Sequence, residues 1–211
     1  EYDIEGVVQV PIHPDIGVDY AAVLRTVLRQ DPDKILVGEI RDPETANTAV
    51  EASLTGHTVF ATLHTGDAPS TVTRLVDMGV EPFLITATLQ AVVAQRLVRT
   101  ICSECKRSYV PDEELLQGLG AGADAIRNAT LYFGDGCERC HHTGYKGRMG
   151  IFEILLVSDE MRAAVHAGAS TGELRQLALR EGMVTLRQAG LQAVLAGKTT
   201  LEEALRETSS L

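Results

Sequence analysis

Short apolar runs alternate along this chain with stretches in which apolar residues recur every three or four positions. Residues 35–37 are a short apolar run of the kind that forms a buried strand, and residues 56–65 indicate a second such strand. The helical spacing of apolar residues predicts helices over residues 20–29 and 69–79. The pattern therefore indicates mixed α/β structure. The other expected elements are a strand over residues 7–12, a helix from Pro43 that Gly56 closes, a helix over residues 81–99, a strand over residues 150–157 and three helical stretches from there to Leu211.

A change of composition divides the chain into three regions. Residues 101–148 contain all four cysteines and seven of the glycines, in short polar runs. Residues 1–100 carry the predicted strands and helices of an α/β core, and residues 149–211 are mainly helical. We therefore expect a core, a small cysteine module and a helical C-terminal region as separate domains.

Polar residues follow two of the predicted strands at the point where each ends. Glu39 follows residues 35–37 after a single glycine, and His64 lies near the far end of the strand expected over residues 56–65. The carboxyl ends of parallel strands meet at one edge of a sheet, where nucleotides bind in open α/β folds. A carboxylate there can orient an attacking water or hold Mg²⁺ through water, although a surface acid or helix cap is the alternative. Gly38 favours the site because it permits close approach of the backbone.

Two histidines and two arginines near these strands are further candidates. His57 and His64 lie seven residues apart, so an extended strand would point them to opposite faces. Either can be a structural hydrogen-bonding group, and His64 is the better candidate for the site. Arg25 and Arg29 are four residues apart and share a predicted helix face. They would form surface salt bridges or supply positive charge to phosphates.

A phosphate-binding loop is absent from the sequence. No Gly-x-x-x-x-Gly-Lys-Ser/Thr occurs, although residues 197–199 read Gly-Lys-Thr. Residue 192 is Gln, and the preceding segment is helical, so Gly197 is predicted to end a helix. The chain begins at Glu1 without Met. We therefore expect a C-terminal piece of a longer protein, with the loop in the part before it.

The four cysteines form two Cys-x-x-Cys pairs, at residues 102–105 and 137–140. Two such pairs, here separated by thirty-one residues, are typical of a tetrahedral Zn²⁺ site, with disulfides as the alternative in an oxidising compartment. His141 and His142 could compete as ligands but are not needed. Four thiolates would make a closed, structural site. The expected ligands are Cys102, Cys105, Cys137 and Cys140.

The net charge of −10 argues against a general nucleic-acid-binding protein. No apolar run reaches the roughly 18 residues that span a bilayer, so no transmembrane segment is expected.

Six segments together are specific for one family: residues 28–33, 37–42, 52–57, 62–65, 94–99 and 143–148. They resemble the secretion-ATPase superfamily, and within it the hexameric ATPases of type II secretion and type IV pilus assembly. The resemblance covers the whole chain, including the four-cysteine insertion. Retraction ATPases of pilus systems look similar in the core but lack the cysteine module.

The resemblance implies a RecA-like parallel-sheet core, truncated at its N-terminal side, that binds ATP and Mg²⁺. Residues 33–42 would be the Walker B segment with Glu39 as the catalytic carboxylate, and residues 56–65 the histidine box. It implies catalytic roles for Arg25, Arg29, His57 and His64, and contacts to nucleotide or Mg²⁺ from Glu1, Glu39, Asp42 and His64.

The resemblance also implies a homo-hexamer that works with inner-membrane platform and cytoplasmic adaptor proteins. It would be cytoplasmic and peripherally associated with the bacterial inner membrane, and would power secretion or pilus assembly. The fragment alone is not expected to hydrolyse ATP. Alternatives are a zinc-ribbon module that binds other proteins without catalysis of its own, and a structural adaptor. Neither accounts for Glu39, the arginines and the histidines together.

Overall fold

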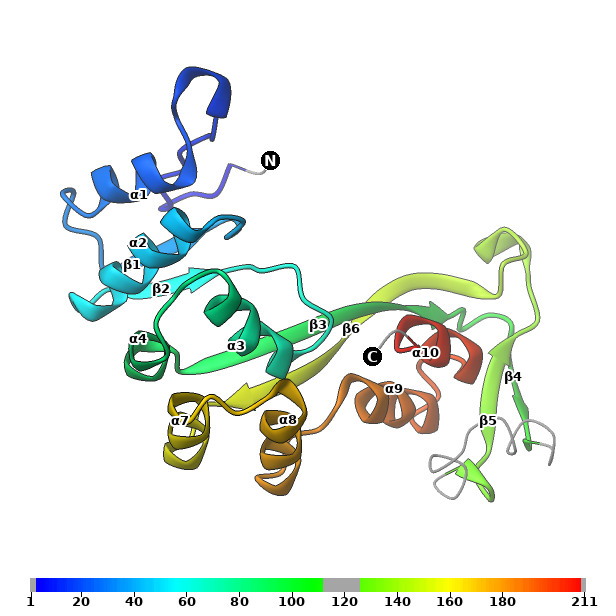
Figure 1. Ribbon diagram of the computed structural model, residues 1–211. Coiled ribbons are helices and arrows are strands. Elements are labelled where there is room, and N and C mark those ends of the chain that lie inside the picture. The colour runs from blue at the N-terminus through cyan, green and yellow to red at the C-terminus, as the bar shows by residue number, and fades with distance from the viewer. Residues whose placement is uncertain (1–2, 112–125, 210–211) are drawn as a thin grey trace. The chain divides into compact units, whose positions relative to one another are not determined.

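The computed structural model describes residues 3–111 and 126–209 and has a mixed α/β fold, as the sequence predicted (Figure 1). None of the helices within those residues is long and apolar enough to cross a membrane. In chain order the elements are α1 (Tyr20–Val27), β1 (Lys34–Val37), α2 (Pro43–Leu54), β2 (Thr58–Ala61), α3 (Ala68–Asp77), α4 (Pro82–Thr88), β3 (Ala91–Ile101), β4 (Lys106–Tyr109), β5 (Leu131–Gly134), β6 (Tyr145–Leu156), α7 (Asp159–His166), α8 (Thr171–Arg180), α9 (Leu186–Leu195) and α10 (Leu201–Glu207), with short 3₁₀ turns at Pro14–Ile16 and Glu138–Cys140.

The chain folds into two compact units. Unit 1 comprises residues 1–65, 69–90 and 157–174, and unit 2 comprises residues 66–68, 91–156 and 175–211. The ranges 1–100, 101–148 and 149–211 cut across these units, because β3 and β6 pair with each other over most of their length. As a division into domains, the three ranges stay a prediction.

Unit 1 contains a parallel strand pair. β1 and β2 pair from Lys34 opposite Thr58 to Val37 opposite Ala61. The connecting helix α2 begins as predicted, because the carboxylate of Asp42 accepts the backbone N–H of Thr45 and Pro43 occupies the first turn. Gly56, with a left-handed φ of 102°, follows the end of the helix. This arrangement brings the carboxyl ends of both strands to one edge.

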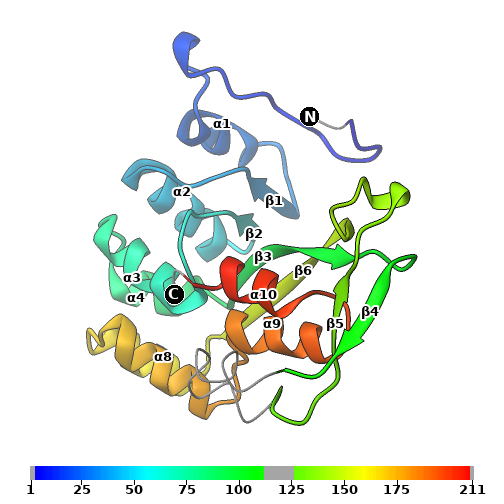
Figure 2. The ribbon, with the colours of Figure 1, turned by 90° about the vertical axis from the view of Figure 1, so that its right-hand side faces the viewer.

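Unit 2 is built on a long antiparallel ribbon of β3 and β6. Helices α9 and α10 lie against this ribbon (Figure 2). Val98 and Ile151 of the ribbon pack with Leu186 and Ala193 of α9 in one buried cluster. A second cluster joins β5 to the same two helices; its buried members are Ile126, Leu131, Leu191, Val194, Leu201 and Ala204.

The helix predicted over residues 81–99 is wrong beyond Thr88. α4 ends there, Leu89 is extended, and β3 begins at Ala91. Val92 and Val98 are buried whereas Val93 and Leu97 are exposed, which is the two-residue period of a strand. Pairing with β6 outweighs the weak helical preference of the Ala- and Leu-rich sequence.

Two smaller predictions also differ from the structure. Residues 7–12 form no strand; in the described part of the chain the only pairing nearby is a single bridge between His13 and Val18. Pro11 lacks the N–H that a ladder needs. Within the described residues after β6 there are four helices instead of the three predicted, and β6 begins at Tyr145, before the predicted residue 150.

The Gly-Lys-Thr sequence at residues 197–199 ends a helix, as predicted. α9 ends at Leu195, and Gly197 adopts a left-handed φ of 64° while its N–H bonds to the carbonyl of Val194. This geometry is a helix C-terminus and not a phosphate loop, which would follow a strand and open a helix.

Candidate functional site

Glu39 and His64 meet at the carboxyl ends of β1 and β2. Glu39 lies two residues beyond the end of β1 and His64 three residues beyond the end of β2. The Nε2 atom of His64 lies 3.3 Å from Oε2 of Glu39. The predicted proximity of these two side chains at one sheet edge is therefore found in the structure.

Arg41 completes this small polar cluster. Its Nε donates to the same Oε2 of Glu39 at 2.5 Å. The side chain of Glu39 is 19% exposed, whereas His64 is 82% exposed and Arg41 71%. Among the described residues, hydrogen bonds reach only Oε2 of Glu39, so Oε1 can accept from another group. The arrangement is a partly buried carboxylate beside an exposed guanidinium and an exposed imidazole.

Backbone contacts fix the two strand ends that carry these side chains. The hydroxyl of Thr62 donates to the carbonyl of Gly38 at 2.6 Å, and the N–H of Ile40 donates to the carbonyl of Thr62 at 2.9 Å. A Cβ on Gly38 would lie 2.8 Å from the hydroxyl of Tyr20. The close approach expected at Gly38 is thus made by the Tyr20 ring of α1.

A surface pocket lies against this cluster within unit 1. Ile40, Arg41, Leu63, His64 and Arg74 line it. Arg74 comes from α3 and brings a second guanidinium to the pocket. Two arginines and a histidine make this pocket suited to an anion, and the adjacent carboxylate of Glu39 is suited to water or a hydrated cation.

His57 lies at the other end of β2, away from Glu39. Its Nδ1 lies 2.9 Å from the carbonyl of Ala52 and 3.0 Å from the hydroxyl of Thr55. Nδ1 must carry a proton to donate to that carbonyl. His57 therefore binds the C-terminal turn of α2, the structural alternative that the sequence left open, and the structure does not bring it to His64.

Neither Arg25 nor Arg29 contacts the cluster in the described structure. Arg25 of α1 forms an exposed ion pair with Glu44 of α2 at 2.5 Å. Arg29 lies beyond the end of α1, so the shared helix face predicted for the two arginines is not formed. Both side chains are on the surface, and their catalytic roles stay predictions.

Asp42 and Glu1 were expected to contact nucleotide or Mg²⁺. The carboxylate of Asp42 accepts both the N–H and the hydroxyl of Thr45, at 2.8 and 2.7 Å. The backbone hydrogen bond from Thr45 holds the pKa of Asp42 below its ordinary value. A helix cap thus occupies this acid. Glu1 lies outside the described residues.

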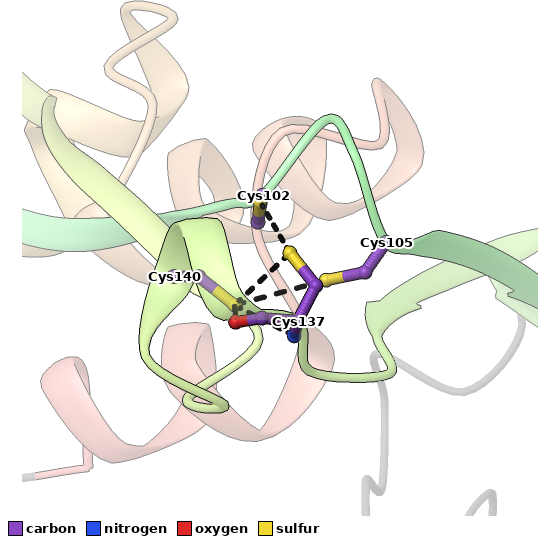
Figure 3. Close-up of side chains that lie close together, drawn as sticks. All are labelled: Cys102, Cys105, Cys137 and Cys140. Atoms are coloured by element: carbon purple, nitrogen blue, oxygen red, sulfur yellow. Dashed lines mark hydrogen bonds between the residues drawn. The ribbon is translucent and has the colours of Figure 1, made fainter.

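The four cysteines converge on one point in unit 2 (Figure 3). Their Sγ atoms lie 3.9 Å apart for Cys102 and Cys137, 3.9 Å for Cys105 and Cys140, and 3.7 Å for Cys137 and Cys140. Zn–S bonds of about 2.3 Å in a tetrahedron place sulfurs about 3.8 Å apart. These separations exceed a disulfide bond of about 2.05 Å. The donor set and its spacing therefore fit a Zn²⁺ ion.

Backbone N–H groups surround the sulfurs. Gly136 donates to Sγ of Cys105 at 3.3 Å, and Cys137 donates to Sγ of Cys140 at 3.2 Å. The bond from Cys137 lowers the pKa of Cys140 to about 6, whereas burial raises the pKa of Cys105 to about 12. A divalent cation at this point would favour the thiolate form of all four cysteines. His141 and His142 are exposed and lie outside this cluster.

Two glycines allow the cysteine turns to close on each other. A Cβ on Gly134 would lie 2.0 Å from the carbonyl oxygen of Gly144. The N–H of Cys102 donates to that same oxygen at 2.9 Å, and the N–H of Asp135 donates to the carbonyl of Cys105. The first cysteine turn is therefore hydrogen-bonded to the residue that follows β5 and to the residue that precedes β6. These two residues flank the second cysteine turn.

Comparison with known proteins places the chain in a family. The profile of the family described as "Type II/IV secretion system protein" matches residues 1–206. The chain belongs to this family. The predicted resemblance is thereby confirmed over nearly all of the sequence.

Two relatives show how similar the chain is to other proteins of this family. It is 55% identical over 208 residues to the "Type IV pilus assembly ATPase PilB" of Thermus thermophilus. This alignment covers 99% of this chain and 23% of the relative. It is 50% identical over 208 residues to "Type II secretion system protein E" of Dickeya dadantii. That alignment covers 99% of this chain and 41% of the relative. The chain thus spans less than half the length of these relatives.

Solved structures show the same fold. The crystal structure of the "Pilus Retraction Motor PilT and Bound ADP" gives a TM-score of 0.61 at 28% identity, covering 91% of this chain and 45% of that one. The structure of the Legionella pneumophila ATPase DotB also gives a TM-score of 0.61, at 23% identity, and covers 92% of this chain and 43% of that one. At this identity the similarity shows the fold alone.

Sequence reasoning did not single out two side chains of the site, Arg41 and Arg74. Arg41 lies two residues after Glu39, and this short spacing was the available signal. Arg74 reaches the pocket from α3, and no local pattern distinguishes it from any exposed arginine on a helix. Its placement depends on the tertiary structure of unit 1.

Proposed function

We propose that this chain is part of an ATP-hydrolysing motor for type II secretion or type IV pilus assembly. Unit 1 would be part of its RecA-like core. The observation that carries the proposal is the meeting of Glu39 with His64 at the carboxyl ends of a parallel strand pair. Membership of the secretion family and similarity to proteins named as ATPases support it.

In the proposed mechanism Glu39 orients the attacking water. Its Oε2 is held by Arg41 and His64, which leaves Oε1 to accept a hydrogen bond from that water. His64, Arg41 and Arg74 line the pocket and would stabilise charge on the phosphates. A bound Mg²⁺ would neutralise phosphate charge, held through water by Glu39, with Asp42 and Glu1 as further candidates.

The remaining candidates have assigned roles in the same proposal. Arg25 and Arg29 would act between subunits of a homo-hexamer, because their exposed side chains are accessible to a neighbour. His57 would act indirectly, by holding α2 to the start of β2.

The cysteine cluster is proposed to hold one structural Zn²⁺. Cys102, Cys105, Cys137 and Cys140 would fill all four positions, so the ion would stabilise the fold of unit 2 and take no part in hydrolysis. In the cell, the motor would lie at the cytoplasmic face of a bacterial inner membrane and act with platform and adaptor proteins. The choice between secretion and pilus assembly stays open, because relatives of both kinds match.

The test is the Glu39→Gln variant of the full-length protein. Gln keeps the size of the side chain but loses the charge that orients water, so we expect ATP turnover to fall at least about a hundredfold with ATP affinity nearly unchanged. Steady-state phosphate release and fluorescent-nucleotide titration measure the two quantities. The matched control is Glu51→Gln, an exposed acid on α2, which should behave as wild type. Wild-type turnover in Glu39→Gln would refute the proposal.

A further inference from the structure

Glu153 of β6 is a buried acid whose two oxygens bind the starts of two helices. It is 3% exposed. Its Oε1 accepts the N–H of Ala68 at 2.8 Å, and its Oε2 accepts the N–H of Leu186 at 3.1 Å. Ala68 begins α3 and Leu186 begins α9, where free N–H groups and the helix dipole favour an anion. In the described part of the chain Glu153 forms no ion pair, so these bonds compensate its burial.

A second contact holds the same short segment. Asp67, also buried, forms an ion pair with Arg175 of α8. Residues 66–68 are therefore bound at two successive positions, Asp67 and Ala68, by residues of unit 2. These three residues belong to unit 2, although the chain on either side of them belongs to unit 1.

The anchored segment follows directly on the candidate site. Only Thr65 separates His64 from Gly66. Consecutive Cα atoms stay about 3.8 Å apart, so His64 cannot move far without pulling on residues 66–68. Whatever fixes this segment also restricts where the imidazole of His64 can lie.

β6 connects the anchor with the cysteine cluster. The strand begins at Tyr145, next to Gly144, whose carbonyl accepts the N–H of Cys102, and it continues to Leu156. Glu153 lies opposite Ala94 in the ladder with β3. One continuous hydrogen-bonded strand thus carries both the anchor and an end of the cysteine turns.

We propose that Glu153 is a positioning residue for hydrolysis, acting through residues 66–68 on His64. It holds the end of the histidine segment so that His64 stays within reach of Glu39. This inference rests on the proposed function as an ATPase.

The test is Glu153→Gln in the full-length protein. The amide nitrogen of Gln donates and cannot accept, so one of the two N–H groups loses its acceptor. We expect kcat for ATP hydrolysis to fall by about tenfold to a hundredfold, with KM and nucleotide affinity within about twofold of wild type. Hydrogen exchange should speed up at Ala68 or Leu186.

The matched control is Glu203→Gln. Glu203 is 1% exposed, belongs to unit 2 and binds Arg99 and Arg206 at the start of α10, with no bond to residues 66–68. Its loss should lower stability but leave kcat within about threefold of wild type. Unchanged kcat in Glu153→Gln, or an equal loss in Glu203→Gln, would overturn the proposal.

A second pair of variants decides the matter if Glu153→Gln does not fold. Arg175→Ala should lower kcat without changing KM, and Arg175→Lys, which keeps the charge opposite Asp67, should recover part of the loss. Equal, wild-type kcat in both would overturn the proposal. Assaying Glu39→Gln alongside separates the two claims. If Glu39→Gln keeps wild-type turnover, the proposed function fails. If Glu39→Gln loses turnover while the Glu153 and Arg175 variants keep it, only this inference fails.

Discussion

At the scale of single residues, the cysteine cluster depends on the absence of a side chain at two glycines. Gly134 and Gly144 pack backbone to backbone, and Gly144 has a left-handed φ of 76°. Its carbonyl also accepts the N–H of Cys102. The distance between the two cysteine turns is therefore set by glycine backbone as well as by the sulfurs.

Replacing Gly144 with Ala should weaken zinc binding and the stability of unit 2. The new Cβ would lie 2.4 Å from the carbonyl oxygen of Gly134, so the turns must separate. We expect a loss of roughly 2 kcal/mol or more in unfolding free energy, with lower zinc content, by denaturation and metal analysis. Gly147→Ala is the control, because its φ of 82° is similar but nothing lies within 4 Å. Equal losses in both variants would exclude the close contact as the cause.

At the scale of elements, local signals were sufficient where one short motif defines a helix end or a strand. Asp42-Pro43 and Gly56 marked the ends of α2, and the apolar runs ending before Glu39 and His64 marked β1 and β2. The helix predicted for residues 91–99 is wrong because alanine and leucine favour a helix locally. The strand that pairs with these residues, β6, lies about sixty residues later in the chain. The Glu39 and His64 pair was predictable for the same local reason, and Arg74 was not, because only tertiary packing brings α3 to the pocket.

The cap of α2 should make stability depend on pH. The folded state lowers the pKa of Asp42, so its stabilising effect is present above the ordinary value of 3.8 and is lost as pH falls through the lowered folded pKa. Asn caps a helix about as well as Asp, so at pH 7 we expect Asp42→Asn to cost only the effect of the charge at the helix N-terminus, about 0.5 kcal/mol in unfolding free energy. Denaturant titrations of both proteins should show this difference shrinking toward pH 3. A difference independent of pH would mean that the charge does not contribute.

At the scale of the whole molecule, β5, which leads to the second cysteine turn, shares a hydrophobic core with α9 and α10. Leu131 of β5 packs with Leu191, Val194 and Leu201, so the metal site is not an isolated appendage. Composition alone predicts residues 101–148 as a separate domain, whereas this cluster contains residues from both sides of residue 148. The reason is that helices far along the chain complete their core, which no local pattern revealed.

Removing the metal should therefore loosen α9 and α10 together with β4 and β5. Structural zinc contributes on the order of 10 kcal/mol in small modules, so chelation should be strongly destabilising. We expect one Zn²⁺ per chain by metal analysis, and faster hydrogen exchange in all four elements after chelation. β1 and β2, in unit 1, should keep their protection. Unchanged exchange in α9 and α10 would show that the shared cluster does not couple them to the metal.

The central claim is that Glu39 and His64 act in one site that hydrolyses ATP, and a double-mutant cycle tests it most directly. The kcat of the full-length protein is measured for wild type, Glu39→Gln, His64→Ala and the double variant. Groups that act together lose their effects together, so His64→Ala should lower kcat in wild type but cost almost nothing further in Glu39→Gln. If the two losses instead multiply, the residues act independently and the account is contradicted.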